Sequence, residues 1–182
     1  MRANREQAAV SRERIVAAAS RLFREKGFDG VGIDAIMQEA GMTHGGFYRH
    51  FGSKEELAAE AVARGMDAAA ERAAAMPLDK YVAAYLSKAH RDDPGGGCVY
   101  AALGCDIARE GAAPRHAMTE RLRAQIERLA AQGGAGPRSA RRKRAIATIA
   151  TLVGALTLAR VVDDAALSDE ILSAARAALP PV

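Results

Sequence analysis

The chain has 182 residues, of which 49% are apolar and 4% aromatic, with no tryptophan and a net charge of +4. This length suits one large domain or two small ones with a substantial core. The first residues lack the apolar segment of a signal peptide, and no apolar run is expected to span a membrane. Only two cysteines are present, which argues against a disulfide-rich secreted scaffold. We expect a cytoplasmic protein without a structural disulfide.

The charge is unevenly distributed along the chain. Residues 1–54 carry nine Lys/Arg against six Asp/Glu, whereas the remaining residues carry seventeen against sixteen. A basic first third on a nearly neutral remainder is typical of a nucleic-acid-binding module joined to another domain. We expect a DNA-binding domain over residues 1–60 and a second domain over residues 61–182.

The first expected helix covers residues 12–26, with Ser11 as its N-cap and Gly27 at its end. Residues 1–10 are polar, and we expect them to form a flexible arm. The apolar stripe of this helix, at helical spacing, consists of Ile15, Ala19, Leu22 and Phe23.

The most informative stretch runs from Ile33 to Lys54 and reads IDAIMQEAGMTHGGFYRHFGSK. Its apolar residues recur at helical spacing until Gly41, which suits the positive-φ position just beyond a helix end. Thr43 then provides an N-cap for a second short helix, HGGFYRHF. Two short helices joined by a glycine turn are the pattern of a helix-turn-helix, here at about residues 33–52. The second helix of such a motif enters the major groove of DNA.

This second helix contains residues that lower helix stability. Gly45 and Gly46 lie in its first turn, where each costs about 1 kcal/mol relative to alanine. Without side chains they permit a close approach to a DNA backbone or base edge. Tyr48, Arg49 and His50 add hydrogen-bonding groups on the outer face. The alternative is a helical hairpin with a solvated basic face.

A longer helix begins directly after the motif. Ser53 starts the sequence SKEE, a capping box with Glu56, and the helix is expected from Glu55 to about Ala75. Lys54 lies in its first turn, where the helix dipole disfavours a cation. A neighbouring phosphate would explain this charge, so Lys54 joins the predicted DNA-binding residues.

The rest of the sequence predicts further helices and no strand. Pro77 begins one of them, and the loop RDDPGGG ends it. A phosphate-binding loop is excluded there because no strand precedes the glycines and no GK[ST] follows. The expected ranges are 78–90, 98–110, 115–132, 145–162 and 167–179. The predicted fold is therefore all-α.

The last two helices carry more apolar surface than one subunit needs. Residues 145–162 are apolar nearly all round, which requires burial on several sides. A symmetric four-helix interface, with two helices from each subunit, meets this requirement. We expect its core to contain Ile149, Val153, Leu156, Ile171, Leu172 and Ala175. The alternative is a wholly intramolecular core.

The two cysteines, Cys98 and Cys105, are about 10.5 Å apart along one helix, which is too far for a disulfide. Cys98 lies at an expected helix N-terminus, where the pKa of a thiol is lowered. This suggests a redox or electrophile sensor as a hypothesis, whereas an inert small residue is the simpler interpretation. A Cys98 nucleophile with His90 or His116 as base can also be drawn, but nothing in the sequence orients either histidine. No cofactor is indicated, and no metal-ligand spacing such as CxxC or HxxxH occurs.

Taken together, the segments LFREKGF, IDAIMQEAGM, GGFYRHF and SKEEL resemble the DNA-binding domain of the tetracycline-repressor (TetR) family of bacterial transcriptional regulators. The resemblance implies a homodimer whose paired recognition helices bind a palindromic operator in double-stranded DNA. It also implies a C-terminal pocket in which a small-molecule effector changes the spacing of the two DNA-binding domains. Release from DNA is the commoner response, so the expected function is a repressor, not an enzyme.

The resemblance also assigns individual residues. Base and backbone contacts fall at Thr43, His44, Gly45 and Gly46, and phosphate contacts fall at Tyr48, His50 and Lys54. Arg49 is a candidate for reading a base, preferably guanine through its bidentate guanidinium. Val31 and Gly32 depart from the Thr or Ser that the family often has before the second helix.

The effector is not readable from the sequence. Residues near the expected pocket helices are Met66, Tyr85, Cys98, Tyr100, Leu103 and Met118, each of which is better explained as ordinary core than as a ligand contact. A helical protein that only binds other proteins is a further alternative, which leaves Gly45, Gly46 and Lys54 unexplained. Salt-dependent DNA binding separates the regulator from the enzyme and from this last alternative.

Overall fold

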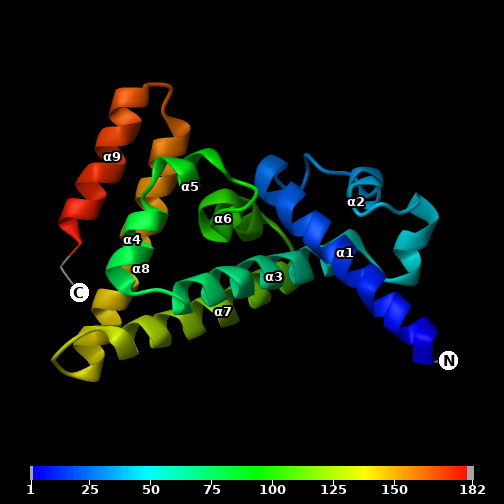
Figure 1. Ribbon diagram of the computed structural model, residues 1–182, viewed down its shortest axis with the longest axis horizontal. Helices are drawn as coiled ribbons and strands as arrows, with labels where there is room; N and C mark the ends of the chain where they lie inside the picture. The colour runs from blue at the N-terminus through cyan, green and yellow to red at the C-terminus, as the bar shows by residue number, and fades with distance from the viewer. Residues whose placement is uncertain (1, 180–182) are drawn as a thin grey trace.

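The computed structural model describes residues 2–179, with side-chain surroundings from residue 6 onward. In chain order its elements are α1 (Arg2–Lys26), α2 (Ile33–Glu39), the 3-10 helix η1 (His44–Arg49), α3 (Lys54–Ala74), α4 (Leu78–Tyr85), α5 (Lys88–Asp92), α6 (Val99–Arg109), α7 (Ala112–Gln132), α8 (Arg138–Val161) and α9 (Ala165–Ala178). No strand occurs within the described range, and the predicted all-α fold is confirmed (Figure 1).

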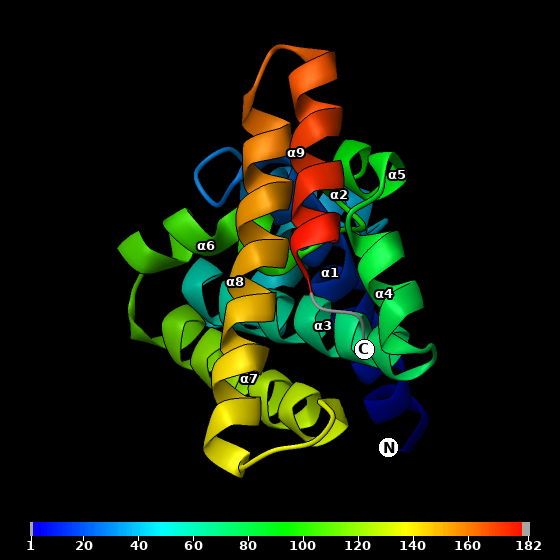
Figure 2. The ribbon, with the colours of Figure 1, turned by 90° about the vertical axis from the view of Figure 1, so that its left-hand side faces the viewer.

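The molecule has two lobes that are bridged by the long helices α3 and α7 (Figure 1). We call the lobe of α1, α2, η1 and the start of α3 the head, and the lobe of α4 to α9 the body. Helices α3 and α7 run side by side in the same direction, joined by the ion pair of Asp67 with Arg121 at 3.1 Å. Helices α8 and α9 form an antiparallel hairpin at the far end of the body (Figure 2).

The head is held together by aromatic side chains and by charged groups that tie its helices to one another. Phe47 and Phe51 are buried and stacked, with ring centroids 5.7 Å apart. The guanidinium of Arg12 on α1 lies 4.1 Å from the centroid of the Phe51 ring and forms ion pairs with Glu56 and Glu60 on α3. These contacts fix η1 between α1 and α3.

The turn of the predicted helix-turn-helix is a Schellman motif. Gly41 has φ of 71°, its N–H donates to the carbonyl of Gln38 at 2.9 Å, and the N–H of Met42 donates to Met37 at 2.8 Å. Glycine is needed because an L side chain disfavours this backbone conformation. The predicted end of α2 is confirmed, as is the cap of α3, where Ser53 accepts from the N–H of Glu56 at 3.1 Å.

Several helix boundaries differ from the prediction, among them the start of α8, which is Arg138 and not residue 145. Helix α1 begins at Arg2, so Ser11 lies inside it and residues 2–10 are helical, not a flexible arm; Met1 lies outside the described residues. The segment before Ser11 is rich in Ala, Arg, Glu and Gln, which are strong helix formers without a break. Pro77 takes the N-cap position of α4 instead of its first helical position.

The expected helix 78–90 is divided into α4 and α5. The hydroxyl of Ser87 donates to the carbonyl of Ala84 at 2.7 Å and accepts from the N–H of His90 at 3.2 Å. One side chain thus satisfies the end of α4 and the start of α5, which is how serine competes with a continuous helix.

The core of the head extends into the body through α6. The buried cluster that contains Phe23 and Met66 also contains Val99, Leu103 and Ile107 of α6. At Gly65 of α3 an added Cβ would lie 2.8 Å from Val99, so a larger residue would push α3 and α6 apart. The boundary at residues 60/61 falls inside the continuous helix α3, and it stays a prediction.

Helix α8 is more apolar than expected. By length and composition it could cross a membrane, the only such helix in the described part of the chain, which corrects the expectation that no run is long enough. It packs against α7 and α9, and 33% of its most apolar window is buried inside the protein. Ile149, Leu156 and Leu172, predicted for a subunit interface, are instead buried inside the protomer at 7%, 0% and 4% exposure.

Candidate DNA-binding site and effector pocket

Most of the predicted DNA-binding residues lie together on the outer surface of the head, on η1 and just before it, whereas His50 directly after η1 and Lys54 at the start of α3 are half-buried. Thr43, His44, Gly45, Tyr48 and Arg49 are exposed, and Tyr48 is 66% exposed. The neighbouring Phe47 and Phe51 point into the core, so η1 presents one face and is held by the other. An exposed tyrosine beside glycines and an arginine is suited to contact a phosphate backbone and base edges.

The second helix of the motif is a 3-10 helix. The N–H of Gly46 donates to the carbonyl of Thr43 at 3.0 Å, a bond between residues three apart. Thr43 occupies the N-cap position as predicted, but its side chain makes no capping hydrogen bond, so that part of the prediction is wrong.

Gly45 has no structural requirement within the described protein. An added Cβ would meet nothing within 4 Å at Gly45, and at Gly46 it would lie 3.4 Å from the methyl group of Met37. Neither glycine has a positive φ. The fold therefore leaves room for alanine at Gly45. A glycine at this position fits a surface that a binding partner approaches closely.

Two of the predicted contact residues have partners inside the head. The imidazole Nδ1 of His44 pairs with the carboxylate of Asp34. The ammonium of Lys54 donates to the carbonyl of Phe28 at 2.5 Å, tying α3 to the connection between α1 and α2. This bond accounts for a cation in the first turn of α3, which the sequence argument had assigned to a phosphate. An ammonium has two further donors, so a DNA contact by Lys54 stays a prediction.

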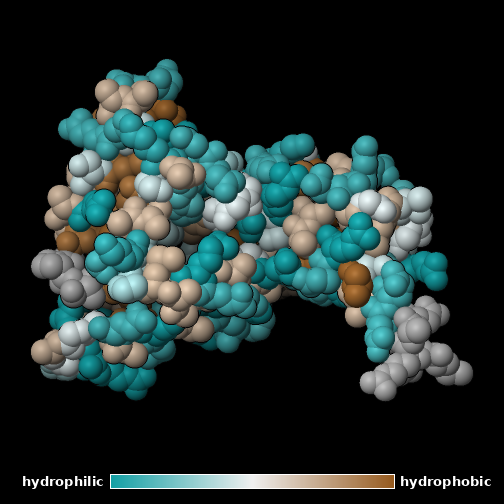
Figure 3. All heavy atoms as spheres, in the orientation of Figure 1, coloured by the Kyte–Doolittle hydropathy of each residue, from teal (hydrophilic) through white to brown (hydrophobic). Residues whose placement is uncertain are grey.

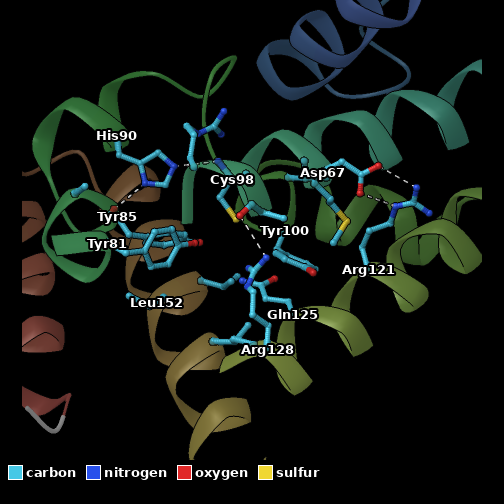
Figure 4. A pocket seen from close by; sticks show the side chains of 18 of the residues that line it. Asp67, Tyr81, Tyr85, His90, Cys98, Tyr100, Arg121, Gln125, Arg128 and Leu152 are labelled. Atoms are coloured by element: carbon cyan, nitrogen blue, oxygen red, sulfur yellow. Dashed lines mark hydrogen bonds and ion pairs between the residues drawn. The ribbon is translucent and has the colours of Figure 1, made fainter. Parts of the chain in front are cut away.

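A cavity of about 210 Å³ lies in the body among α3, α4, α6, α7 and α8 (Figure 4). Met66, Tyr85 and Cys98, predicted for the effector site, line this cavity. Leu103 and Met118 do not: Leu103 is buried in the core shared with the head, and Met118 packs against that core. Leu103 is four residues beyond Val99 on α6 and Met118 is three residues before Arg121 on α7, so both lie next to the cavity and not in its wall.

Cys98 is the N-cap of α6, as expected, but its chemistry is the reverse of the prediction. Burial raises the pKa of the Cys98 thiol, because desolvation outweighs the favourable helix N-terminus. Both Cys98 and Cys105 are free, which confirms that they form no disulfide with each other.

His90 cannot serve Cys98 as a base. Its Nε2 accepts a hydrogen bond from the backbone N–H of Cys98 at 3.0 Å, and its Nδ1 lies 2.7 Å from the carbonyl of Tyr85. The first bond requires an Nε2 without a proton and the second requires a proton on Nδ1, so the ring is neutral. Burial lowers the pKa of His90, in agreement. The other candidate base, His116, is exposed on α7, whereas Cys98 is buried. Across residues 2–179, no three His, Cys, Asp or Glu side chains are grouped to hold a metal ion.

Comparison with known proteins identifies the family. Residues 15–61 match the model of the bacterial regulatory proteins, tetR family. The HTH-type transcriptional regulator LmrA of Bacillus subtilis is 51% identical over 53 residues, which cover 29% of this chain and 28% of LmrA. An uncharacterized HTH-type transcriptional regulator of Mycobacterium tuberculosis is 33% identical over 168 residues, which cover 82% of this chain and 84% of that protein. The chain belongs to the TetR family.

TetR-family membership makes the chain a transcriptional regulator with an N-terminal helix-turn-helix and a helical C-terminal domain. The crystal structure of Escherichia coli NemR in its reduced form shares this fold, with a TM-score of 0.74, 23% identity, and coverage of 94% of this chain and 99% of that one. TetR-family homologues are regulators and not enzymes. The match to LmrA spans little more than a quarter of that protein.

The pocket also contains residues that the sequence did not reveal. Tyr81 comes from α4, and Gln125 and Arg128 come from α7. Tyr100 of α6, which was a candidate from the sequence, also lines the cavity. The four-residue spacing of Tyr81 and Tyr85 on one helix was a signal for an aromatic wall. Nothing in the sequence distinguishes Arg128 from the other arginines of α7.

Proposed function

We propose that this TetR-family regulator is a cytoplasmic homodimeric repressor that is released from a palindromic operator by a small-molecule effector. The observation that carries the proposal is the outer face of η1. Gly45, Tyr48 and Arg49 are exposed there, on a helix whose opposite face is buried, and the fold does not itself require the glycine. Two such heads, one from each subunit, would read two half-sites of an operator.

An apolar surface on α8 and α9 supports the dimer. Ile146, Leu158, Val161 and Leu167 are 44%, 57%, 75% and 42% exposed, and the first three recur at helical spacing on one face of α8. Hydrophobic side chains are visible at this end of the body, whereas the head is largely hydrophilic (Figure 3). An exposed apolar face of this kind is typical of a subunit interface. The proposed interface therefore uses exposed residues of α8 beside the predicted ones, of which Ile149 and Leu156 are buried inside the protomer.

Helix α6 provides a physical link between the pocket and the head. Its first turn, with Val99 and Tyr100, lines the cavity, while Val99, Leu103 and Ile107 belong to the core of the head. A ligand that displaces this turn would also displace the packing around α1. An effector of this type acts by binding one head arrangement more tightly than the other.

The alternative of a sensor cysteine has weaker support. The Cys98 thiol is 7% exposed and its pKa is raised, both of which oppose reaction with an oxidant or electrophile. Similarity to NemR at 23% identity concerns the fold and does not transfer a role to any residue. Effector binding in the cavity is therefore the preferred mechanism.

The proposal is tested by footprinting the purified protein on the DNA that flanks its own gene. We expect protection of two symmetric half-sites, with an altered base preference in the Arg49→Ala variant worth about 1–3 kcal/mol at one position of each half-site. Arg123→Ala, at an exposed arginine of α7, is the control and should bind as the wild type does. A single asymmetric footprint, or an unchanged preference in Arg49→Ala, would contradict the proposal.

A further inference from the structure

The size of the cavity limits the effector that it could hold, and the inference developed here rests on the function proposed above. Its volume is about 210 Å³. A cavity of about 150 Å³ holds one benzene molecule, and pockets for drug-sized ligands measure about 300–1,000 Å³. A molecule of one or two rings fits without rearrangement, whereas a long acyl chain or a large polycyclic compound does not.

The walls favour a flat aromatic ring. The Tyr81 and Tyr85 rings lie 5.8 Å apart between centroids, and the Tyr85 ring meets the His90 ring edge-on at 4.7 Å. Tyr100 stands on the other side of the cavity, and Leu152 of α8 adds an aliphatic surface (Figure 4). Offset and edge-to-face contacts with such rings add to the hydrophobic gain of burying a planar ligand.

Two tyrosine hydroxyls among the residues that line the cavity have no hydrogen-bond partner in the described part of the chain. The hydroxyls of Tyr85 and Tyr100 are buried and donate to no group among the described residues, and Tyr85 as a whole is only 7% exposed. The nearest polar neighbour of Tyr85, the Cys98 thiol, is a weak acceptor. Burial raises the pKa of all three pocket tyrosines, that of Tyr81 to about 12, so each hydroxyl keeps its proton and acts as a donor. Buried donors of this kind need an acceptor from a ligand or water.

The charge of the lining is positive. The lining contains three arginines and one carboxylate, Asp67, which is paired with Arg121. Arg128, which is partly buried, donates only to the carbonyl of Ala70 at 3.3 Å, and the described chain places no carboxylate within ion-pair distance of it. Its guanidinium acts electrostatically on the hydroxyls of both Tyr81 and Tyr100 and lies between these two side chains in Figure 4.

We propose that the effector is a small aromatic carboxylate, with its ring between Tyr81, Tyr85 and Tyr100 and its carboxylate on Arg128. The guanidinium fork matches the two oxygens of a carboxylate, and the Tyr81 and Tyr100 hydroxyls donate to the same group. Arg128 is the specificity-determining residue, since among the arginines that line the cavity Arg72 is exposed and Arg121 is paired with Asp67.

The test compares carboxylates with neutral molecules of the same shape. Benzoate, 4-hydroxybenzoate and 2-naphthoate are titrated into the protein by calorimetry, beside the corresponding primary amides. We expect at least one carboxylate to bind at least about tenfold more tightly than its amide, the range expected of a charge-assisted hydrogen bond. Equal or tighter binding of every amide, or no binding by any of the three carboxylates, overturns the proposal.

Variants locate the carboxylate. Arg128→Gln should lose at least about tenfold in carboxylate affinity with little change for the amide, and Arg128→Lys should recover part of the loss. Arg123→Gln, on an exposed face of the same helix, is the matched control and should bind both ligands normally. An Arg128→Gln variant that still discriminates carboxylate from amide as the wild type does overturns the assignment. Melting temperature and binding of ligand-free variants to operator DNA are recorded in parallel. If the ligand-free wild type does not bind operator DNA, the proposed function is refuted. If it binds operator DNA but does not prefer carboxylates to amides, only the proposed ligand class is refuted.

Discussion

The Gly45→Ala variant separates the stability of the protein from its affinity for DNA. An alanine Cβ at this position meets no heavy atom within 4 Å, and the backbone φ is not positive, so the folded head accepts it without strain. Alanine in place of an exposed helical glycine stabilises by about 0.5–1 kcal/mol. For a protein of this size such a gain corresponds to a rise in melting temperature of about 1–4 °C.

DNA affinity should change in the opposite direction. If the DNA backbone or a base edge approaches Gly45 as closely as its missing side chain permits, the added methyl group displaces η1 from the groove. We expect a loss of about tenfold, equivalent to about 1.4 kcal/mol, in fluorescence anisotropy titrations with operator DNA. The control is Gly104→Ala on α6, where an added Cβ also meets nothing within 4 Å and DNA affinity should not change. A Gly45→Ala variant that binds DNA as tightly as the wild type would refute the close approach, and a lowered melting temperature would refute the claim that the fold has room.

Three further predictions concern the interface, the thiols and a helix cap. Leu158→Glu should dissociate the dimer in sedimentation experiments and abolish operator binding, whereas Val10→Glu, at a similarly exposed residue of α1, should leave the dimer intact; a dimeric Leu158→Glu would exclude this face. Iodoacetamide should modify the exposed Cys105 first and Cys98 slowly. Because the pKa of Cys98 is raised, the rate of its alkylation should still increase with pH where the alkylation rate of an ordinary thiol no longer does. Fast labelling of Cys98 near neutral pH would contradict this. Ser53→Ala should cost about 1 kcal/mol through loss of the α3 cap and lower the melting temperature by about 2–4 °C, and an unchanged melting temperature would argue against the cap.

The parts of the fold that were predictable depend on neighbours close in sequence. Gly27 and Gly41 end helices because the residue at that position needs a positive φ, and both have one. Ser53 caps α3 through a bond to a residue three positions later. These signals act within one helical turn, so a single sequence contains all the information needed to read them.

Features that depend on distant segments were not predictable in the same way. Helix α8 is apolar nearly all round, so helical spacing alone did not distinguish Leu156, which is buried in its own subunit, from Leu158, which is exposed. The N-terminal position of Cys98 on α6 was read correctly, but its effect on the thiol was outweighed by burial against other helices. Arg128 acquires its place only when α7 packs beside α3.

The central claim, that this TetR-family protein binds operator DNA in a sequence-selective manner through its head, is tested most directly by fluorescence anisotropy across a salt series. The probe is the DNA that flanks the gene, and a scrambled duplex of equal length is the control. The account predicts saturable binding that prefers the natural sequence and weakens steeply with salt, since phosphate contacts dominate the affinity. Equal affinity for both duplexes, or no binding by reduced protein freed of any co-purified ligand, would contradict it.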